Sequence, residues 1–560
     1  MAQPDLRTPD GLARAINEAA GYYQQGRLDD ADKICTRVLK AAPDWFDALH
    51  LAGLLKLDSG KVAAAQVLLA KALKLNPNAP QVLANYGRTL SALNRDDEAM
   101  ASLDKALSLA PGSFETINIR GNVLLKLNRP AEAVAAFERV LALEPRFLGA
   151  RANLGNALAQ LGRFEEALAH YDAVMAVQPA HPEMLVNRAG ALGGVGRLDE
   201  ALTAYDRALA LRPDYGKARI GRGATLAALN RHQDALKEYA SALAADKSNA
   251  DIQHNEALSL LTLGDYAKGF QKYEARWLRT GMPRRKSFGK PLWLGEYPLA
   301  RKTILVHAEQ GLGDTIQFAR YVPQLARAGA KVVLEVQKEL VPLLSRVEGV
   351  ASVVARGDAL PAYDVHCPAG SLPLALRTEV ATVPADVPYL AANEERVAKW
   401  RERIGHLPSP RIAVAWSGSA DHANDRNRSI SLERFAPVFA GTGGSIVSIQ
   451  RELRGGDADA LARLGNVTHV GDALADFDDT AAVMALADLV ISVDTAVVHL
   501  AGAMGRPVWV LLPFQPDWRW RLDRDDTPWY PTMRLFRQPK PGDWDSVIAR
   551  VRDELSRGVI

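Results

Sequence analysis

The stretch SVDTAVVHLAGAMGRPVWVLLP, residues 492–513, contains the end of a strand, a helix and a second strand in close succession. The apolar run at residues 489–493 ends at Asp494 and Thr495, where a helical pattern begins. A second apolar run follows at residues 507–513. Two strands joined through a helix indicate a parallel α/β sheet.

The start of this helix is a candidate anion site. The first backbone N–H groups of a helix have no partner within it, and the helix dipole favours negative charge, so the two together suit a diphosphate. Thr495 adds a hydroxyl donor, and His499 lies one turn further along the same face, within reach of a phosphate or a sugar. A structural explanation is also open, in which Asp494 caps the helix and His499 is a hydrogen-bonded core histidine.

Further apolar runs alternate with helical patterns and fall into two sets. The first set is TILVHA (303–308), KVVLEV (331–336), SVVA (352–355) and YDVHCP (363–368). The second set is RIAVAW (411–416), GSIVSIQ (444–450), VTHVG (467–471), LVISVD (489–494) and PVWVLLP (507–513). A polar helix at residues 393–404 and two prolines separate the sets, which predicts two Rossmann-like lobes with a cleft between them. The last helix, residues 544–556, is expected to pack back across the first lobe.

The first half of the chain repeats every 34 residues. Prolines recur at Pro43, Pro77, Pro111, Pro145, Pro179 and Pro213, and alanines at Ala31, Ala65, Ala99, Ala133, Ala167, Ala201 and Ala235. Small residues stand twelve positions before each alanine, at Ala19, Gly53, Gly87, Gly121, Gly155, Ala189 and Gly223. This pattern resembles the tetratricopeptide repeat family, with seven repeats over residues 12–249 and a degenerate eighth over 250–283 as a cap. Small residues let the two helices of a repeat approach closely, and we expect Phe137, Tyr171, Tyr205 and Tyr239 to fill the space between repeats.

Four asparagines share one position of the repeat. They are Asn85, Asn153, Asn187 and Asn255. Such a row can pair with the backbone of an extended peptide, because an amide side chain both donates and accepts hydrogen bonds. The alternatives are that these side chains are solvated or bond to neighbouring repeats.

Composition sets the broad class of the protein. The 560 residues include 68 basic and 65 acidic side chains, so the formal charge of +3 does not suggest a nucleic-acid partner. The two cysteines, Cys35 and Cys367, suit a reducing compartment. The N-terminal residues lack an apolar signal core, and no run approaches the ~20 apolar residues of a membrane span. We therefore expect a cytoplasmic protein.

The stretch EQGLGDTIQFARYVP, residues 309–323, directly follows the first strand of the first lobe. It is not a P-loop, because no Gly-Lys-Ser/Thr follows its glycines, and Ile316 stands where a dinucleotide fingerprint needs its last glycine. It reads as a tight strand-to-helix turn that places Asp314 in the first turn of a helix, which is favourable to the dipole.

The motif at residues 492–507 resembles the DSGPMHLAAALGRP-type motif of the lipopolysaccharide heptosyltransferases, with Asp494, Thr495 and His499 on its Asp, hydroxyl and His positions. That resemblance implies a GT-B fold with a nucleotide-sugar donor on the second lobe. Thr-Ala-Val-Val replaces Ser-Gly-Pro-Met here, which puts the loop geometry in question. In the same family the Gly-Asp loop carries the proposed catalytic base. Its counterpart here is Asp314, with Gly311 and Gly313 allowing close approach and Glu309 and Gln310 as acceptor contacts.

Taken with the repeats, the whole chain resembles bacterial repeat-containing glycosyltransferases. These are relatives of the heptosyltransferases and of the O-linked N-acetylglucosamine transferases, and some modify flagellin. We therefore expect an all-α repeat superhelix followed by a GT-B fold. The expected segments are repeats at 12–283, a linker at 284–301, a first lobe on the acceptor side at 302–395, an interlobe linker at 396–409, a second lobe on the donor side at 410–538 and a C-terminal helix at 539–560.

Other loops of the second lobe are candidate donor contacts. Ser417 and Gly418 follow its first strand, where backbone can approach a phosphate, and Arg426 and Arg428 could neutralise a departing diphosphate. A solvated polar loop is the alternative. The loops at 450–452, with Gln450, and at 478–480 are candidates for binding the base or the ribose.

The aromatic segment PFQPDWRWRLDRDDTPWYP, residues 513–531, is a candidate cover for the base or sugar. The preferred interpretation is that Trp518, Trp520 and Trp529 pack the return to the first lobe. No metal-ligand spacing emerges, and the Asp523-Arg524-Asp525 triplet only superficially resembles a metal motif. We predict transfer without a metal or another cofactor.

These features predict a glycosyltransferase that moves a sugar from a nucleotide-sugar donor to Ser or Thr hydroxyls of a protein acceptor. The repeats would bind that acceptor or a chaperone. Asp314 would be the base, and Arg428 and His499 would act with it at the reacting groups. Three rivals remain: a non-catalytic repeat scaffold with a degenerate GT-B domain, a GT-B sugar-nucleotide epimerase, and a lipopolysaccharide-type glycosyltransferase.

Overall fold

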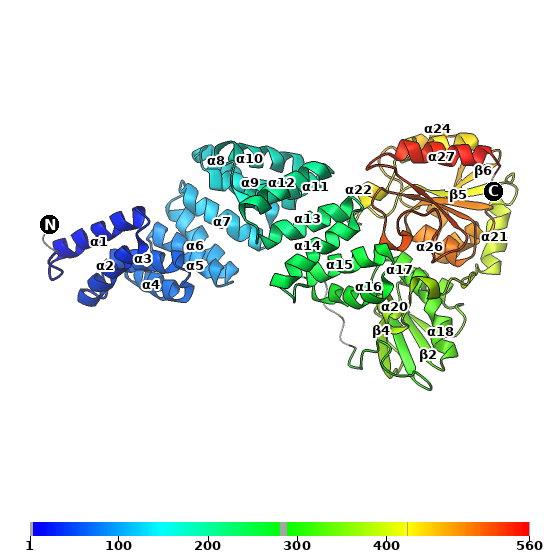
Figure 1. Ribbon diagram of the computed structural model, residues 1–560, viewed down its shortest axis with the longest axis horizontal. Coiled ribbons are helices and arrows are strands. Elements are labelled where there is room, and N and C mark those ends of the chain that lie inside the picture. Colours follow the sequence, from blue (N-terminus) through cyan, green and yellow to red (C-terminus); the bar gives the residue numbers. More distant parts are fainter. Residues whose placement is uncertain (1–3, 280–287, 423, 559–560) are drawn as a thin grey trace. The chain divides into compact units, whose positions relative to one another are not determined.

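The computed structural model describes residues 4–279, 288–422 and 424–558 (Figure 1). The predicted linker at 284–301 lies partly outside these residues. The chain divides into two compact units, Met1–Gly221 and Arg222–Ile560. The second unit therefore contains the last repeats together with both α/β sheets.

Between residues 4 and 279 the chain forms sixteen α-helices in eight successive pairs. The first helices of the pairs are α1 (Pro9–Gln24), α3 (Phe46–Asp58), α5 (Pro80–Ala92), α7 (Phe114–Lys126), α9 (Leu148–Gln160), α11 (Pro182–Gly194), α13 (Gly216–Ala228) and α15 (Ala250–Leu263). The second helices are α2 (Leu28–Ala41), α4 (Val62–Leu75), α6 (Asp96–Leu109), α8 (Pro130–Leu143), α10 (Phe164–Val177), α12 (Leu198–Leu211), α14 (His232–Ala245) and α16 (Tyr266–Tyr273). A short 3₁₀ helix, η1 (Glu274–Leu278), follows the last pair.

The recurring glycines admit aromatic rings. A Cβ added to Gly155 would lie 2.6 Å from the Tyr171 ring, and one added to Gly223 would lie 2.6 Å from Tyr239. These rings therefore fill the space between the two helices of their own repeat, and so does Phe137 against its own glycine. The expected position between repeats holds for Tyr205, whose hydroxyl would lie 2.4 Å from a Cβ on Gly221 in the next repeat.

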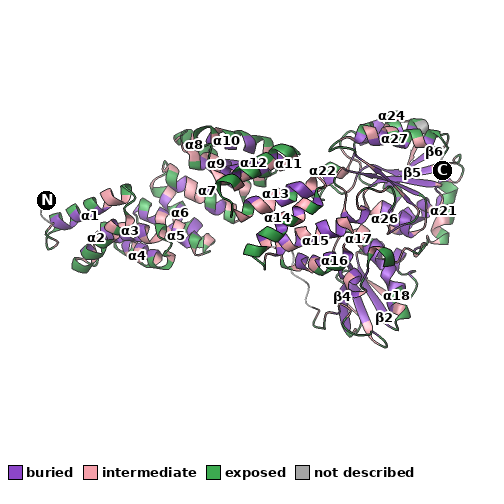
Figure 2. Ribbon diagram, in the orientation of Figure 1, coloured by how far each residue is buried: buried purple, intermediate pink, exposed green. Residues whose placement is uncertain are grey.

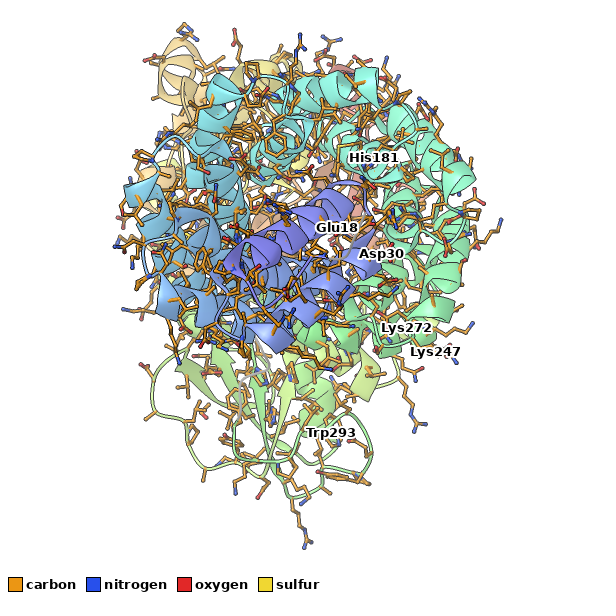
Figure 3. The ribbon with its side chains drawn as sticks, turned by 90° about the vertical axis from the view of Figure 1, so that its left-hand side faces the viewer. Glu18, Asp30, His181, Lys247, Lys272 and Trp293 are labelled. Atoms are coloured by element: carbon orange, nitrogen blue, oxygen red, sulfur yellow. The ribbon has the colours of Figure 1, made fainter. Side chains whose placement is uncertain are left out.

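Burial follows the helix pairs. Buried residues lie where helices face one another, and exposed residues cover the outer faces (Figure 2). Charged side chains of the array form ion pairs, such as exposed Arg27 with Asp30 at 2.7 Å and partly buried Lys272 with Glu256 at 2.8 Å. Asp30 and Lys272 are labelled in Figure 3. No helix in the described part of the chain is long and apolar enough to cross a membrane.

The first sheet is parallel, with the strand order β3-β2-β1-β4. Its strands are β1 (Thr303–His307), β2 (Lys331–Val336), β3 (Val350–Ala355) and β4 (Val365–Pro368). The order reverses between β1 and β4. Ligands of open α/β sheets bind at the carboxyl ends of the strands beside such a reversal, and here the loop that carries Asp314 follows β1.

The second sheet is also parallel, with the order β10-β9-β8-β5-β6-β7. Its strands are β5 (Arg411–Ala415), β6 (Ser445–Ser448), β7 (Val467–His469), β8 (Leu489–Val493), β9 (Val508–Leu512) and β10 (Met533–Arg537). This is the doubly wound dinucleotide-binding order, with its reversal between β5 and β8. The two predicted donor loops follow those two strands.

Helices cover both sheets. They are α17 (Leu312–Phe318), α18 (Val322–Arg327), α19 (Val341–Leu344), α20 (Leu372–Ala375), α21 (Glu394–Ile404), α22 (Asp425–Arg428), α23 (Leu432–Phe435), α24 (Asp457–Arg463), α25 (Phe477–Ala485), α26 (Ala496–Ala503) and α27 (Trp544–Ser556). The expectation that the last helix packs on the first lobe is wrong. Val547 and Val551 of α27 are buried in one cluster with Val414 and Ile491 of the second sheet.

The last repeats share a core with the α/β part. One cluster of buried side chains contains Tyr266 and Phe270 of α16 together with Trp518 and Trp529 from the segment after β9. Trp529 Nε1 donates to the Tyr266 hydroxyl at 3.0 Å. The fold expected from the sequence is confirmed: a helical repeat array followed by two parallel α/β sheets consistent with GT-B lobes.

Candidate active site

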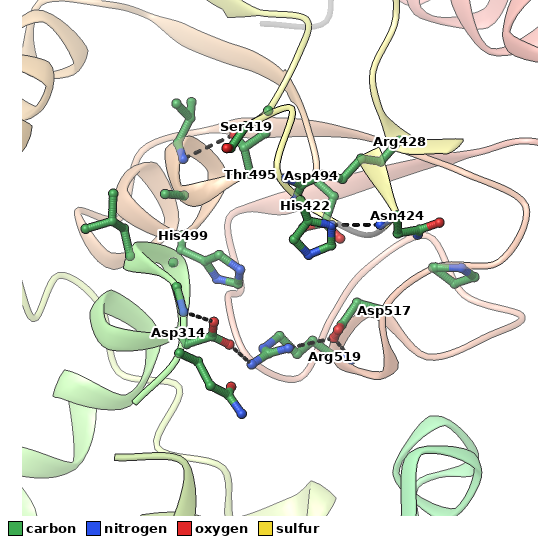
Figure 4. Close-up of a pocket in the computed structure, with 18 of the residues that line it drawn as sticks. Asp314, Ser419, His422, Asn424, Arg428, Asp494, Thr495, His499, Asp517 and Arg519 are labelled. Carbon is green, nitrogen blue, oxygen red and sulfur yellow. Dashed lines mark hydrogen bonds and ion pairs between the residues drawn. The ribbon is translucent and has the colours of Figure 1, made fainter. Parts of the chain in front are cut away.

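A cavity of about 1110 Å³ opens where the strand ends of both sheets meet the last repeats (Figure 4). Its walls come from the loop after β1, the loops after β5, β6, β8 and β9, and the helices α13 to α15. The residues of these elements that line the cavity all belong to the second compact unit.

The first-lobe wall is the start of α17. Gly311 caps this helix, and its backbone N–H donates to Asp314 Oδ2 at 3.0 Å. Asp314 is thus fixed in the first turn, where the helix dipole favours a carboxylate. Gln310, just before the cap, donates from Nε2 to the Tyr273 hydroxyl at 2.6 Å.

The second-lobe wall is the start of α26. Thr495 caps this helix, and its hydroxyl accepts from the backbone N–H of Val497 at 3.3 Å. Asp494 does not cap the helix: its Oδ2 accepts from Trp520 Nε1 at 2.8 Å, and its carbonyl accepts from Arg428 Nη1 at 2.9 Å. Burial, with a smaller contribution from Asp517, raises the pKa of the Asp494 carboxyl to about 6.

The loop after β5 is held by Gln450. Its Oε1 accepts from the backbone N–H of Ser417 at 3.1 Å, and its Nε2 donates to the Ser417 carbonyl at 3.2 Å. These two bonds fix the backbone of the loop at Ser417. The Ser417 hydroxyl, in a residue only 5% exposed, has no hydrogen-bond partner among the described residues. A Cβ on Gly418 would lie 2.5 Å from Arg428 Nη2, so glycine is what lets the guanidinium approach this loop.

The two lobes touch at the glycine of the first-lobe loop. A Cβ on Gly313 would lie 2.8 Å from His499 Cδ2 and 3.3 Å from Ala496 Cα. His499 Nδ1 and the Tyr530 hydroxyl are 3.0 Å apart, and the imidazole stacks on Trp520 with ring centroids 5.4 Å apart. Burial lowers the pKa of His499 well below its ordinary value, so the ring is neutral at pH 7.

An arginine that the sequence reasoning missed contacts Asp314 directly. Arg519 Nη2 donates to Asp314 Oδ1, and Arg519 Nη1 donates to Asp517 Oδ1 at 2.9 Å (Figure 4). Burial raises the pKa of the Asp314 carboxyl, and the Arg519 guanidinium opposes that rise. The only sequence signal for Arg519 was its place in a charged segment that leaves the carboxyl end of a strand next to β8.

The repeats form the third wall. Side chains of α13 to α15 that line the cavity include His232, Tyr239, Asn255 and Ser259. His232 Nδ1 lies 3.2 Å from the Ser259 hydroxyl, and burial lowers the pKa of this histidine to about 4. The cavity is therefore bounded by repeat side chains as well as by the two lobes.

Most of the predicted site residues line this one cavity. They are Gln310, Gly311, Gly313, Asp314, Ser417, Gly418, Arg428, Gln450, Asp494, Thr495, His499 and Asn255. Arg426 is exposed on α22 and does not line it. Glu309 does not line it either, because its carboxylate is buried and pairs with Arg276 at 2.8 Å.

The other three asparagines of the predicted ladder lie in the first unit and pair with side chains of neighbouring repeats. Asn85 Nδ2 lies 3.0 Å from His50 Nε2. Asn153 Nδ2 donates to Asn118 Oδ1 at 3.4 Å, and Asn187 Nδ2 donates to Asn156 Oδ1 at 2.9 Å. These contacts correspond to the alternative in which the asparagines bond between repeats.

In the remaining candidate segments, some residues make structural contacts and others line the cavity. Residues 478–480 are not a loop as predicted but lie in the first turn of α25. Asp478 is buried and pairs with Arg346 of the first lobe, whereas Thr480 lines the cavity. Trp518, Trp520 and Trp529 are buried. Trp518 and Trp529 pack against Tyr266 of α16, so part of the aromatic segment packs on the last repeat. Trp518 also lines the cavity.

Comparison with known families agrees with both halves of the fold. Models described as tetratricopeptide repeat match residues 56–115, 120–183, 186–250 and 225–283. A model described as glycosyltransferase family 9 (heptosyltransferase) matches residues 473–517, which include Asp494, Thr495 and His499. The chain combines tetratricopeptide repeats with a glycosyltransferase family 9 domain. The matched residues include the start of α26, which lines the cavity.

Protein FlbA of Caulobacter vibrioides is 28% identical to this chain over 332 residues. The match covers 55% of each protein, so the chain spans about half the length of that relative. Among solved structures, the repeats are similar to a tetratricopeptide repeat protein from Parabacteroides merdae, with 16% identity over 44% of this chain and 98% of that one, and a TM-score of 0.36. YrrB, a TPR protein with an unusual peptide-binding site, is 24% identical over 33% of this chain and 95% of its own, with a TM-score of 0.28.

The arrangement has the parts that group transfer from a diphosphate needs. A carboxylate with a burial-raised pKa faces a helix start and an arginine across one cavity. Among the described residues, no group of three or more His, Cys, Asp or Glu side chains is arranged to hold a metal ion.

Proposed function

We propose that the protein is a glycosyltransferase that moves a sugar from a nucleotide-sugar donor to a Ser or Thr hydroxyl of a protein acceptor. One observation carries the proposal. The carboxylate of Asp314 lines the same cavity as Arg428 and the helix start at Thr495, although these residues come from two different lobes.

The donor diphosphate binds at the start of α26. Arg428 and the Thr495 hydroxyl border this position, and the unpartnered Ser417 hydroxyl provides a further hydrogen-bonding group beside it. Because Gly418 has no side chain, the Arg428 guanidinium can lie against this loop next to the diphosphate position. The nucleoside lies toward the loops after β6 and β7, next to Gln450 and Thr480.

The transfer is a single displacement at the anomeric carbon. The acceptor oxygen forms the new bond to that carbon while the bond from the carbon to the diphosphate oxygen breaks. Asp314 accepts the hydroxyl proton, and Arg428 with the helix dipole stabilises the charge on the departing diphosphate. This course inverts the configuration at the anomeric carbon and needs no metal. His499, neutral and held by Tyr530, fixes the boundary between the two lobes and borders the sugar.

A protein acceptor is supported by the third wall of the cavity. Tetratricopeptide repeats bind proteins, and here the last repeats lie directly against the reacting groups. A small-molecule epimerase would not need such a wall. The acceptor is flagellin or another surface protein, as the resemblance to repeat-containing glycosyltransferases implies.

Two measurements test this function. Purified protein is incubated with a panel of uridine-, guanosine- and adenosine-diphosphate sugars, and release of the nucleoside diphosphate is followed. Intact-mass spectrometry then compares flagellar and surface proteins from cells with and without the gene. We expect turnover of at least one donor. We also expect one protein from cells without the gene to be lighter, by the mass of one or more sugars, than the same protein from cells with the gene.

Negative outcomes of the two measurements have different meanings. Absence of both donor binding and donor turnover would overturn the enzymatic proposal in favour of a repeat scaffold. Release of nucleoside diphosphate without any mass change on a protein would overturn the protein acceptor and favour a lipopolysaccharide-type transferase. Conversion of a donor into its epimer, with no nucleoside diphosphate released, would favour an epimerase.

A further inference from the structure

Arg519 is one of the most constrained side chains at the cavity. It lies in the 3₁₀ helix η8 (Trp518–Trp520), which Asp517 caps by accepting from the Arg519 backbone N–H at 3.0 Å. Its side chain is only 8% exposed. Burying an arginine is costly unless its donors are paired. The partners of Arg519 therefore indicate its role.

Three side-chain oxygens accept hydrogen bonds from the guanidinium, two from α17 of the first lobe and one from the segment after β9. Nη2 donates to Asp314 Oδ1, Nη1 to Asp517 Oδ1, and Nε to Gln317 Oε1. Gln317 is fully buried, and its amide oxygen points to Arg519, whereas its Nε2 has no partner among the described residues. The guanidinium carbon also lies 4.5 Å from the centroid of the Trp518 ring, a distance suited to a cation–π contact.

Asp314 is held from both sides as a result. One carboxylate oxygen accepts from Arg519 and the other from the backbone N–H of Gly311. Each oxygen keeps a further lone pair for another donor. With 25% of its side chain exposed, Asp314 remains open to the cavity.

We infer that Arg519 is a positioning residue, which fixes the Asp314 carboxylate in one orientation and keeps it ionised so that it can accept a proton. The inference rests on the proposed function for the role of Asp314 as base. It goes beyond that function by assigning a second residue, from the opposite lobe, to control of the base.

The charges around Asp314 give the direction of this effect. The titratable groups that face it are Arg519 and Asp517 from the segment after β9, Tyr273 from α16, His422 from the loop after β5, and the neutral His499 from α26. Burial raises the pKa of Asp314, Arg519 lowers it, and Asp517 raises it. Removing Arg519 leaves the carboxylates of Asp314 and Asp517, which are 25% and 38% exposed, without the cation that they share. The pKa of Asp314 then rises further.

Carbodiimide labelling of Asp314 tests the inference without a substrate. A water-soluble carbodiimide activates protonated carboxyl groups, an added amine captures them, and peptide mass mapping gives the extent of labelling at Asp314 against pH. In Arg519→Gln the midpoint is expected to rise by about 1 to 3 pH units, the range that a close opposite charge produces. In Asp517→Asn it is expected to fall, and in Arg519→Lys, which keeps the charge, to stay near the wild-type value.

The opposite signs separate this role from a merely structural one. A midpoint for Arg519→Gln equal to that of wild type, or equal shifts in Arg519→Gln and Asp517→Asn, would overturn the inference. Arg519→Lys is the variant least disturbing to the fold, and thermal melts of all three proteins show whether they are folded. If Arg519→Gln does not fold, Arg519→Lys and Asp517→Asn still give the predicted unchanged and lowered midpoints.

Donor turnover adds a second readout that is specific to the chemistry. With the nucleotide sugar that wild type uses, Arg519→Ala is expected to lose more than tenfold in kcat with little change in KM for the donor. Guanidinium ion added at millimolar concentration is expected to restore part of that loss. Absence of turnover by wild type would count against the proposed function alone, because the labelling result stands independently of it.

Discussion

The repeats of the first unit and those of the second share one sequence motif but have different surroundings. Asn187, in the first unit, donates to Asn156 of a neighbouring repeat, whereas Asn255, at the same repeat position in the second unit, lines the cavity. Tyr171 and Tyr239 fill equivalent glycine gaps, yet only Tyr239 borders the reacting groups. The shared motif therefore determines how a repeat packs, and the neighbouring structure determines what the repeat does.

The second-unit repeats are also joined to the lobes by specific bonds. Asn230 Nδ2 donates to the Phe514 carbonyl at 2.7 Å, and Arg276 forms an ion pair with Glu309 at 2.8 Å. Residue 309 belongs to the same loop as Asp314. We therefore expect destabilising substitutions in the second-unit repeats to disturb the active site. Similar substitutions in the first-unit repeats should leave the active site unchanged.

The largest contrast is expected from a matched pair of core tyrosines. Tyr171 and Tyr266 are both 1% exposed, and truncating either to alanine should cost about 3 to 5 kcal/mol of local stability because a ring-sized cavity is left. Tyr171→Ala should destabilise the first unit and leave donor turnover unchanged. Tyr266→Ala should destabilise the second unit and abolish donor turnover. Hydrogen–deuterium exchange read by mass spectrometry reports each unit separately. Equal loss of turnover in both variants would remove the distinction between the two sets of repeats.

A pH-dependent contrast follows from His232 in the wall of the cavity. Its pKa is lowered to about 4 in the folded protein, so the unfolded chain binds the proton more tightly. Stability is therefore present near neutral pH and is lost as pH falls from the ordinary value of 6.5 toward 4, by up to about 3 kcal/mol. His232→Gln should lose less stability on acidification than wild type, as measured by urea unfolding at several pH values. Parallel pH profiles for the two proteins would contradict the assignment.

A smaller contrast comes from the asparagines. Asn187→Ala removes a partly buried hydrogen bond between repeats and should cost about 1 kcal/mol without changing transfer. Asn255→Ala should leave stability nearly unchanged and lower transfer to the protein acceptor, while donor turnover with water as acceptor stays close to wild type. Urea unfolding and acceptor mass spectrometry measure the two effects. Reversed effects would place the acceptor contacts in the first unit.

Much of the fold could be predicted from local patterns. All nine predicted strands are present, because buried parallel strands read as continuous apolar runs. The tenth strand, β10, was missed because it is an edge strand whose run, Met533–Arg537, is interrupted by arginines. The contact of α27 with the second sheet was also missed, since an amphipathic helix shows which face it buries but not what it is buried against.

The site was predictable where one segment carries its own signal. The loops at Asp314 and at Asp494 each stand out at the end of a strand, but only the fold shows that they border one cavity. Arg519 could not be singled out, because its role depends on Asp314 and Gln317 from the other lobe. Glu309, in contrast, looked like an acceptor contact in the sequence and is buried against Arg276.

The account depends most on the separate roles of the two lobes, and a paired measurement on Asp314→Asn and Arg428→Gln tests them directly. Donor affinity is measured by isothermal titration with the nucleotide sugar that wild type turns over, and turnover is measured by nucleoside diphosphate release.

We predict that Asp314→Asn binds the donor nearly as tightly as wild type and turns it over about 100-fold or more slowly, as loss of a general base requires. Arg428→Gln should bind the donor more weakly. Loss of donor binding in a folded Asp314→Asn protein, with turnover retained in Arg428→Gln, would contradict the account.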